Sequence, residues 1–89
     1  MRWDTPRLLE AKPTEGWSVW LRWEDGVAAE VDLGRVVGDG AVFQPLRDPE
    51  YFRRIAIYPG GMTLHWPNEA DIAPETLYEW TEEAAGVSA

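Results

Sequence analysis

The side chains that could perform chemistry gather in the last third of the sequence. One imidazole, that of His65, is followed by four carboxylates, those of Glu69, Asp71, Glu75 and Glu79. Carboxylate and imidazole groups held close together can bind a divalent metal ion. The sequence therefore offers His65, Asp71 and Glu75 as candidate metal ligands of a small metal-dependent enzyme or hydrolase.

These residues also have a structural explanation, which we favour. Asp71 stands just before a predicted helix and can cap its free amides, and Glu75 suits the positive end of the helix dipole. His65 falls in a predicted strand, with no serine or cysteine near it in sequence to be activated. The only serines, Ser18 and Ser88, lie in a predicted strand and in the C-terminal tail. We therefore expect no catalytic residues, no cofactor and no bound metal.

Phosphate binding has little support either. The glycine-containing stretches at 38–40 and 60–61 lack the lysine and the strand-to-helix context of a phosphate-binding loop. The first stretch also carries an aspartate, Asp39, which would repel a phosphate. We interpret both stretches as turns.

Trp20 indicates a different function, which is contact with a protein partner. Strand alternation places Trp20 on the polar face with Arg22, opposite Glu30. An exposed tryptophan flanked by charges is typical of an interface hot spot. The alternative is that a helix or the N-terminal Trp3 covers Trp20. The candidate partner-binding residues are Trp20, Arg22, Glu30 and, on the acidic last helix, Glu79.

The composition indicates which partners fit. The 89 residues include 16 acidic and 8 basic side chains, for a formal net charge of −8. Such a surface repels phosphate backbones, so we expect a basic protein partner and no direct binding of nucleic acid. The chain has no cysteine, which excludes disulfides and thiol catalysis. We find no signal peptide and no apolar stretch near ~20 residues, so we expect a cytoplasmic protein without membrane contact.

A predicted β-hairpin at 17–33 must position Trp20. Apolar residues alternate along both arms, with Trp17, Val19, Leu21 and Trp23 on the first and Val27, Ala29, Val31 and Leu33 on the second. A two-residue turn would split these two rows between the faces of the sheet. A three-residue turn at 24–26, with Gly26 left-handed, keeps them on one face. We therefore predict the pairs Trp23 with Val27, Leu21 with Ala29, and Val19 with Val31.

Three elements surround this hairpin in the sequence. A strand is predicted at 7–12, and a short turn capped by Asp32 follows the hairpin at 33–37. The next segment, 42–46, is predicted to be irregular because Pro45 interrupts it. Asp48 then predicts the cap of a helix of about two turns, with Pro49 at its first position.

A second hairpin precedes the last helix. Proline excludes a primed two-residue turn, so we predict a four-residue loop at 58–61, which pairs Ile57 with Met62 and Ile55 with Leu64.

The last helix is predicted from Pro74 to Glu83. Its expected inner face consists of Leu77, Trp80 or Thr81, and Ala84. Acidic residues lie at the unfavourable end of its dipole, so the tail 84–89 is expected to fray. The sequence thus predicts one α+β domain over 1–89. It has two layers: a mostly antiparallel sheet of about five strands, made of a three-stranded meander and a second hairpin, packs against two or three short helices.

Four motifs occur in a specific order and spacing. They are Leu-Arg-Trp-Glu-Asp-Gly at 21–26, Val-Asp-Leu at 31–33, Val-Phe-Gln-Pro-Leu-Arg-Asp-Pro-Glu-Tyr-Phe at 42–52, and Leu-His-Trp-Pro-Asn-Glu-Ala-Asp-Ile-Ala-Pro-Glu-Thr-Leu-Tyr at 64–78. Each motif alone is weak, but the ordered set closely resembles the bacterial family called domain of unknown function 2442. The resemblance covers about residues 6–80.

The resemblance implies a small α+β domain without assigned activity or catalytic residues. Some relatives carry an added helix-turn-helix domain, and others are encoded beside a second small protein in an arrangement that looks like a toxin–antitoxin pair. This chain differs at Trp23, where phenylalanine is common, and at Glu69 or Ala70, where glycine is common. These differences concern packing and turn shape. We do not expect the DNA-binding role of some relatives to transfer, because 89 residues leave no room for the added domain.

Three hypotheses of function follow. The first is a non-enzymatic protein-interaction module, an antitoxin-like acidic partner of a small basic protein encoded next to it. The alternatives are the metal-dependent enzyme described above and a transcription-related regulator. Because an open sheet has edges that can pair between copies, we also expect at most a weak homodimer.

Overall fold

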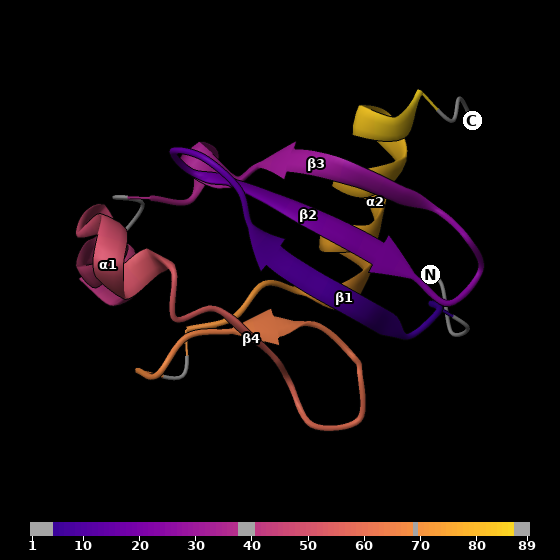
Figure 1. Cartoon of the computed structure of the whole chain (residues 1–89). Helices are drawn as coiled ribbons and strands as arrows, with labels where there is room; N and C mark the ends of the chain where they lie inside the picture. The colour runs from indigo at the N-terminus through magenta and orange to yellow at the C-terminus, as the bar shows by residue number, and fades with distance from the viewer. Residues whose placement is uncertain (1–4, 38–40, 69, 87–89) are drawn as a thin grey trace.

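The protein is described here from a computed structural model, over residues 5–37, 41–68 and 70–86 (Figure 1). The elements are β1 (Leu8–Pro13), β2 (Ser18–Trp23), β3 (Ala28–Asp32), the 3₁₀ helices η1 (Leu33–Arg35) and η2 (Ala41–Arg47), α1 (Pro49–Phe52), β4 (Ala56–Ile57), β5 (Leu64–His65) and α2 (Pro74–Ala85). The strands form a three-stranded antiparallel sheet in the order β1-β2-β3 and a separate pair, β4-β5. The predicted α+β class is confirmed.

The hairpin of β2 and β3 has the predicted register. Val19 pairs with Val31 and Leu21 with Ala29. The amide of Trp23 donates to the carbonyl of Val27 at 2.8 Å. The connecting turn ends at a glycine with φ of 96°, as the three-residue turn requires. Both apolar rows therefore lie on one face, and this inner face is covered by α2, which passes behind the sheet in Figure 1.

β1 contains a bulge that the sequence pattern did not predict. Leu8 lies opposite Trp23 and Glu10 lies opposite Arg22, so Leu9 is an extra residue in the strand. Simple alternation would place Leu8 on the same face as Glu10. The bulge instead turns Leu8 inward, where it is 2% exposed, and leaves Glu10 on the opposite face.

A buried hydrogen bond joins the sheet to the helix. The indole Nε1 of Trp23 donates to Oγ1 of Thr81 at 3.0 Å, and that hydroxyl donates to the carbonyl of Leu77 at 2.8 Å. The ring of Tyr78 meets the Trp23 ring edge-on, with centroids 5.1 Å apart. The inner face of α2 thus consists of Leu77, Tyr78 and Thr81. The prediction for Ala84 was wrong, because this residue is exposed and the last turn of α2 reaches past the sheet in Figure 1.

The register predicted for the second hairpin was wrong. Ile57 pairs with Leu64 and not with Met62. The loop has four residues as predicted, but it includes Met62, which is 59% exposed. Gly61 lies inside this loop with φ of 73°, and its carbonyl accepts a hydrogen bond from the amide of Leu8 at 2.7 Å. A shift of two residues keeps every side chain on its predicted face, which is why alternation could not identify the register.

The helix caps predicted at Asp32 and Asp48 are confirmed, whereas the lengths of the helices differ from those predicted. Asp32 and Asp48 cap η1 and α1, accepting from the amides of Gly34 at 2.8 Å and Glu50 at 3.0 Å. α1 has a single turn instead of about two, and the segment predicted to be irregular forms η2 around Pro45. α2 extends past its predicted end to Ala85, and the next residue ends it in a left-handed conformation. None of the helices in the described ranges combines the length and the apolar composition that crossing a bilayer requires.

The bond between Trp23 and Thr81 generates a stability prediction. Thr81→Val keeps the shape of the side chain but leaves the buried indole N–H without an acceptor, which should lower the free energy of unfolding by about 1–3 kcal/mol. Urea unfolding measures this change. In a Trp23→Phe background the same substitution should cost clearly less, because no indole N–H remains. An equal cost in both backgrounds would contradict the structural role of this bond.

Candidate functional site

The side chains of the three-stranded sheet that point away from α2 form a surface that we call the outer face. It consists of Glu10, Lys12, Ser18, Trp20, Arg22, Ala28, Glu30 and Asp32. The strand registers align these side chains in rows across the sheet. One row is Lys12, Trp20 and Glu30, and the next is Glu10, Arg22 and Ala28.

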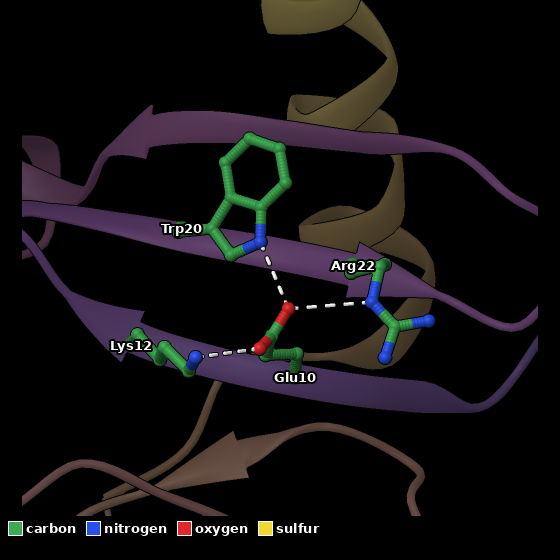
Figure 2. A network of polar contacts seen from close by, with 4 residues as sticks. All are labelled: Glu10, Lys12, Trp20 and Arg22. Carbon is green, nitrogen blue, oxygen red and sulfur yellow. Dashed lines mark hydrogen bonds and ion pairs between the residues drawn. The ribbon is translucent and has the colours of Figure 1, made fainter.

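Glu10 is the centre of a polar network on the outer face (Figure 2). Its Oε1 accepts hydrogen bonds from Nε1 of Trp20 at 3.0 Å and from Nε of Arg22 at 3.3 Å. Its other oxygen, Oε2, lies 2.8 Å from Nζ of Lys12. One carboxylate from β1 thus engages two side chains of β2, and it holds the half-buried Trp20 ring in a fixed direction across the sheet.

The network keeps Glu10 ionised. Hydrogen bonds from Lys12, Trp20 and Arg22, with that from Lys12 the largest influence, lower the pKa of Glu10 to about 2. The outer face is therefore a mixed surface, in which a fixed negative charge lies between two positive ones beside an aromatic ring.

The structure brings together three of the four predicted partner-binding residues. Trp20, Arg22 and Glu30 are neighbours on the outer face, whereas Glu79 is exposed on α2, on the other side of the sheet. α2 does not cover Trp20, because the helix packs on the inner face. The alternative cover, Trp3, lies outside the described residues.

Sequence reasoning missed Glu10 and Lys12. A signal was present, since the two lie two residues apart in the first predicted strand and so share a face. Which face they share depends on the bulge at Leu9, and that bulge was not predicted.

The candidate metal ligands have other roles in this fold. His65 and Asp71 form an isolated antiparallel bridge, and the ring of Tyr58 meets the His65 ring edge-on at 5.0 Å. The prediction that Asp71 caps the last helix was wrong: the cap position is Ala73, with no side-chain hydrogen bond. Glu75 does lie in the first turn of α2. Over the described residues, no three histidine, cysteine or carboxylate side chains are grouped so that they could hold a metal ion.

Among the hollows lined by described residues, two lie away from the outer face. One of about 130 Å³ is lined by Gly16, Trp17, Pro49 and Arg53, and one of about 250 Å³ is lined by Tyr58, Met62, Thr63, Asp71 and Pro74. Both are smaller than the roughly 300–1,000 Å³ typical of small-molecule sites. Of the surfaces that the described residues form, we therefore take the outer face as the candidate site.

The network around Glu10 predicts a pH dependence of stability. A carboxyl group whose pKa is about 2 when folded and near 4.5 when unfolded stabilises the folded state above pH 4.5, and this contribution is lost as the pH falls toward 2. The urea midpoint of the protein should therefore exceed that of Glu10→Gln near pH 7, and the difference should shrink on acidification. An NMR titration gives a direct control, because Lys12→Gln should raise the pKa of Glu10. A difference that is independent of pH would contradict the network.

Comparisons with known proteins show one similar crystal structure and one matching family. It is similar to the crystal structure described as "Putative DNA Binding Protein NE0471" from Nitrosomonas europaea ATCC 19718, with a TM-score of 0.76 and 27% sequence identity. The similarity covers 91% of this chain and 52% of the other, so this chain spans about half the length of that protein. Among curated proteins, none matches the chain. The family described as "Protein of unknown function (DUF2442)" matches residues 8–83, in agreement with the resemblance found in the sequence motifs. The chain therefore belongs to the DUF2442 family.

Proposed function

We propose that this chain is a non-enzymatic module that binds another protein through the outer face of its sheet. The observation that carries the proposal is the position of Trp20, held on that face by its hydrogen bond to Glu10 at 3.0 Å. Tryptophan and arginine are the residue types most enriched in interface hot spots. Trp20 and Arg22 are both present here, tied to the same carboxylate.

The fixed geometry of the network favours binding. Association costs free energy when mobile side chains must be ordered at an interface. Trp20 and Arg22 already have their polar groups in place, so a partner that stacks on them would meet a partly ordered surface. The half-buried indole leaves part of its ring available for this contact.

The net charge of −8 indicates the kind of partner. An acidic surface attracts a basic protein and speeds the encounter between the two. This agrees with the antitoxin-like role suggested by the family resemblance, in which an acidic protein binds a basic one encoded beside it. The metal-dependent enzyme has less support, because the carboxylates near His65 form no ligand group within the described ranges.

A second candidate is a transcription-related regulator. It is favoured by the description of the similar Nitrosomonas europaea protein as DNA binding. However, the similarity covers only 52% of that protein, so its description does not assign DNA contact to the shared half. The charge of −8 opposes such contact in this chain. In a regulator, the outer face would therefore bind protein.

Substitution of Trp20 tests the first candidate. Partners captured on the tagged full chain from cell extract are identified by mass spectrometry, and the affinity of the enriched protein is measured by calorimetry. Trp20→Thr should weaken binding by about 30-fold or more, since it removes an anchor worth about 2 kcal/mol or more. The matched control is Tyr58→Thr, which removes an aromatic residue that is 42% exposed outside the outer face. Equal affinities of both variants, or no enrichment over the tag alone, would refute this function.

Direct DNA contact has its own test. Fluorescence anisotropy with duplex DNA at about 50 mM salt should show no binding by this chain, because phosphate contacts need clustered basic residues. Binding that weakens steeply as salt rises would favour the regulator and contradict the electrostatic argument.

A further inference from the structure

β3 is an edge strand whose outward backbone groups can be identified from the ladder. Its only neighbour in the sheet is β2. The amide of Trp23 donates to Val27 and the amide of Leu33 donates to the carbonyl of Trp17, so the odd-numbered residues of this arm face β2. In an antiparallel pair these roles alternate, and the N–H and C=O groups of Ala28 and Glu30 therefore point outward.

Those outward groups have no partner in the part of the chain that the structure describes: no described residue forms a hydrogen bond with the backbone of Ala28 or Glu30. The other edge, β1, is covered in part. The amide of Leu8 donates to Gly61 in the loop between β4 and β5, and Pro13 has no amide hydrogen to donate. The two edges of the same sheet are thus treated unequally.

Charge makes β3 a poor match for a second copy of itself. Antiparallel pairing of two β3 strands places the Glu30 side chains of the two copies directly opposite each other or on the diagonal, within about 8 Å. Like charges at these positions are unfavourable, and acidic edges commonly prevent self-association in this way. The same charges favour an added strand that carries basic residues.

We propose that β3 accepts an extended basic segment of a partner protein as a fourth strand of the sheet. The inference rests on the proposed function, because it assumes a protein partner, and it specifies how that partner binds. Addition of a strand to an open edge is a general mode of recognition, in which the backbone supplies hydrogen bonds and alternate side chains supply specificity.

The strand registers define what the added segment must contain. A residue placed opposite Glu30 extends the row of Lys12, Trp20 and Glu30 on the outer face. Glu30 is exposed, and its carboxylate makes no ion pair with any described residue, so lysine or arginine fits this position. The next outer-face position of the segment lies opposite Ala28, whose short side chain leaves room for the aliphatic stem of a second lysine or arginine.

A designed peptide tests the proposal on the unmodified protein. The probe is a capped Lys-Val-Lys-Val-Lys-Val peptide, and the measurement is amide hydrogen exchange followed by NMR. At millimolar peptide, exchange at Ala28 and Glu30 should slow by about tenfold or more, since their amides become paired. The amides of Ala29 and Val31 already face β2 and should change little.

Two control peptides separate backbone pairing from simple charge attraction. A Lys-Val peptide with an N-methyl group on every residue keeps its charge but can neither donate to β3 nor approach it closely along either edge, so it should give no protection. A Glu-Val-Glu-Val-Glu-Val peptide should also give none, because its charges repel Glu30. Absence of protection by the Lys-Val peptide would overturn the proposal, and equal protection by the Glu-Val peptide would overturn the basic class of the partner.

A variant of the protein distinguishes this inference from the broader function. Ala28→Pro removes one outward N–H and leaves the ladder to β2 intact, because proline is tolerated where an edge amide faces solvent. The substitution should lower the affinity for the captured natural partner by about tenfold or more. If Trp20→Thr loses that partner while Ala28→Pro binds it normally, strand addition fails and the interaction module stands. If neither variant weakens the partner, both proposals fail.

Discussion

The hydrogen bond between the Trp23 indole and the Thr81 hydroxyl is the contact on which the arrangement of the two layers depends. Burial of apolar surface is non-directional, so apolar packing alone would let a helix slide over a sheet. A donor that has left water must instead meet an acceptor near 3 Å, and here that acceptor is on α2. The bond fixes α2 on the inner face, so the helix does not cover the outer face.

The sequence predicted the parts of the structure that local chemistry determines. The turn between β2 and β3 followed from the need to keep two apolar rows on one face, and the register of Val19 with Val31 confirms it. The caps formed by Asp32 and Asp48 could be predicted because each carboxylate accepts a hydrogen bond from the amide only two residues later in the chain. Alternation also placed Trp20 on the polar face, so the main residue of the candidate site came from the sequence.

The remaining features depend on contacts that are distant in sequence. The pairing of Ile57 with Leu64 preserves the same faces as the predicted register, and it is favoured by a contact between the loop and β1. Asp71 lies in a bridge with His65, two residues before the cap position of α2 at Ala73, and is therefore too far from the helix to be its cap. The role of Glu10 in the site was hidden because its face depends on the irregularity next to it.

Two glutamates on the outer face, one on each edge strand of the sheet, have different surroundings. On the outer face, Glu10 is neutralised by its neighbours, whereas Glu30 forms no ion pair with any residue that the structure describes. Glu10, on the edge strand β1, therefore orders the protein's own side chains, whereas Glu30, on the edge strand β3, is exposed. A net charge alone could not make this distinction between two carboxylates of the same sheet.

The extra residue in β1 also has a consequence for how relatives of this protein can differ. If Leu9 were absent, Leu8 would precede Glu10 directly and would still lie opposite Trp23, in an ordinary ladder. Strand length at this point can therefore vary by one residue over evolution without exchanging interior for surface. Deletion of this residue would keep every side chain of β1 on its face, whereas deletion of one residue within β2 would turn part of its buried row outward.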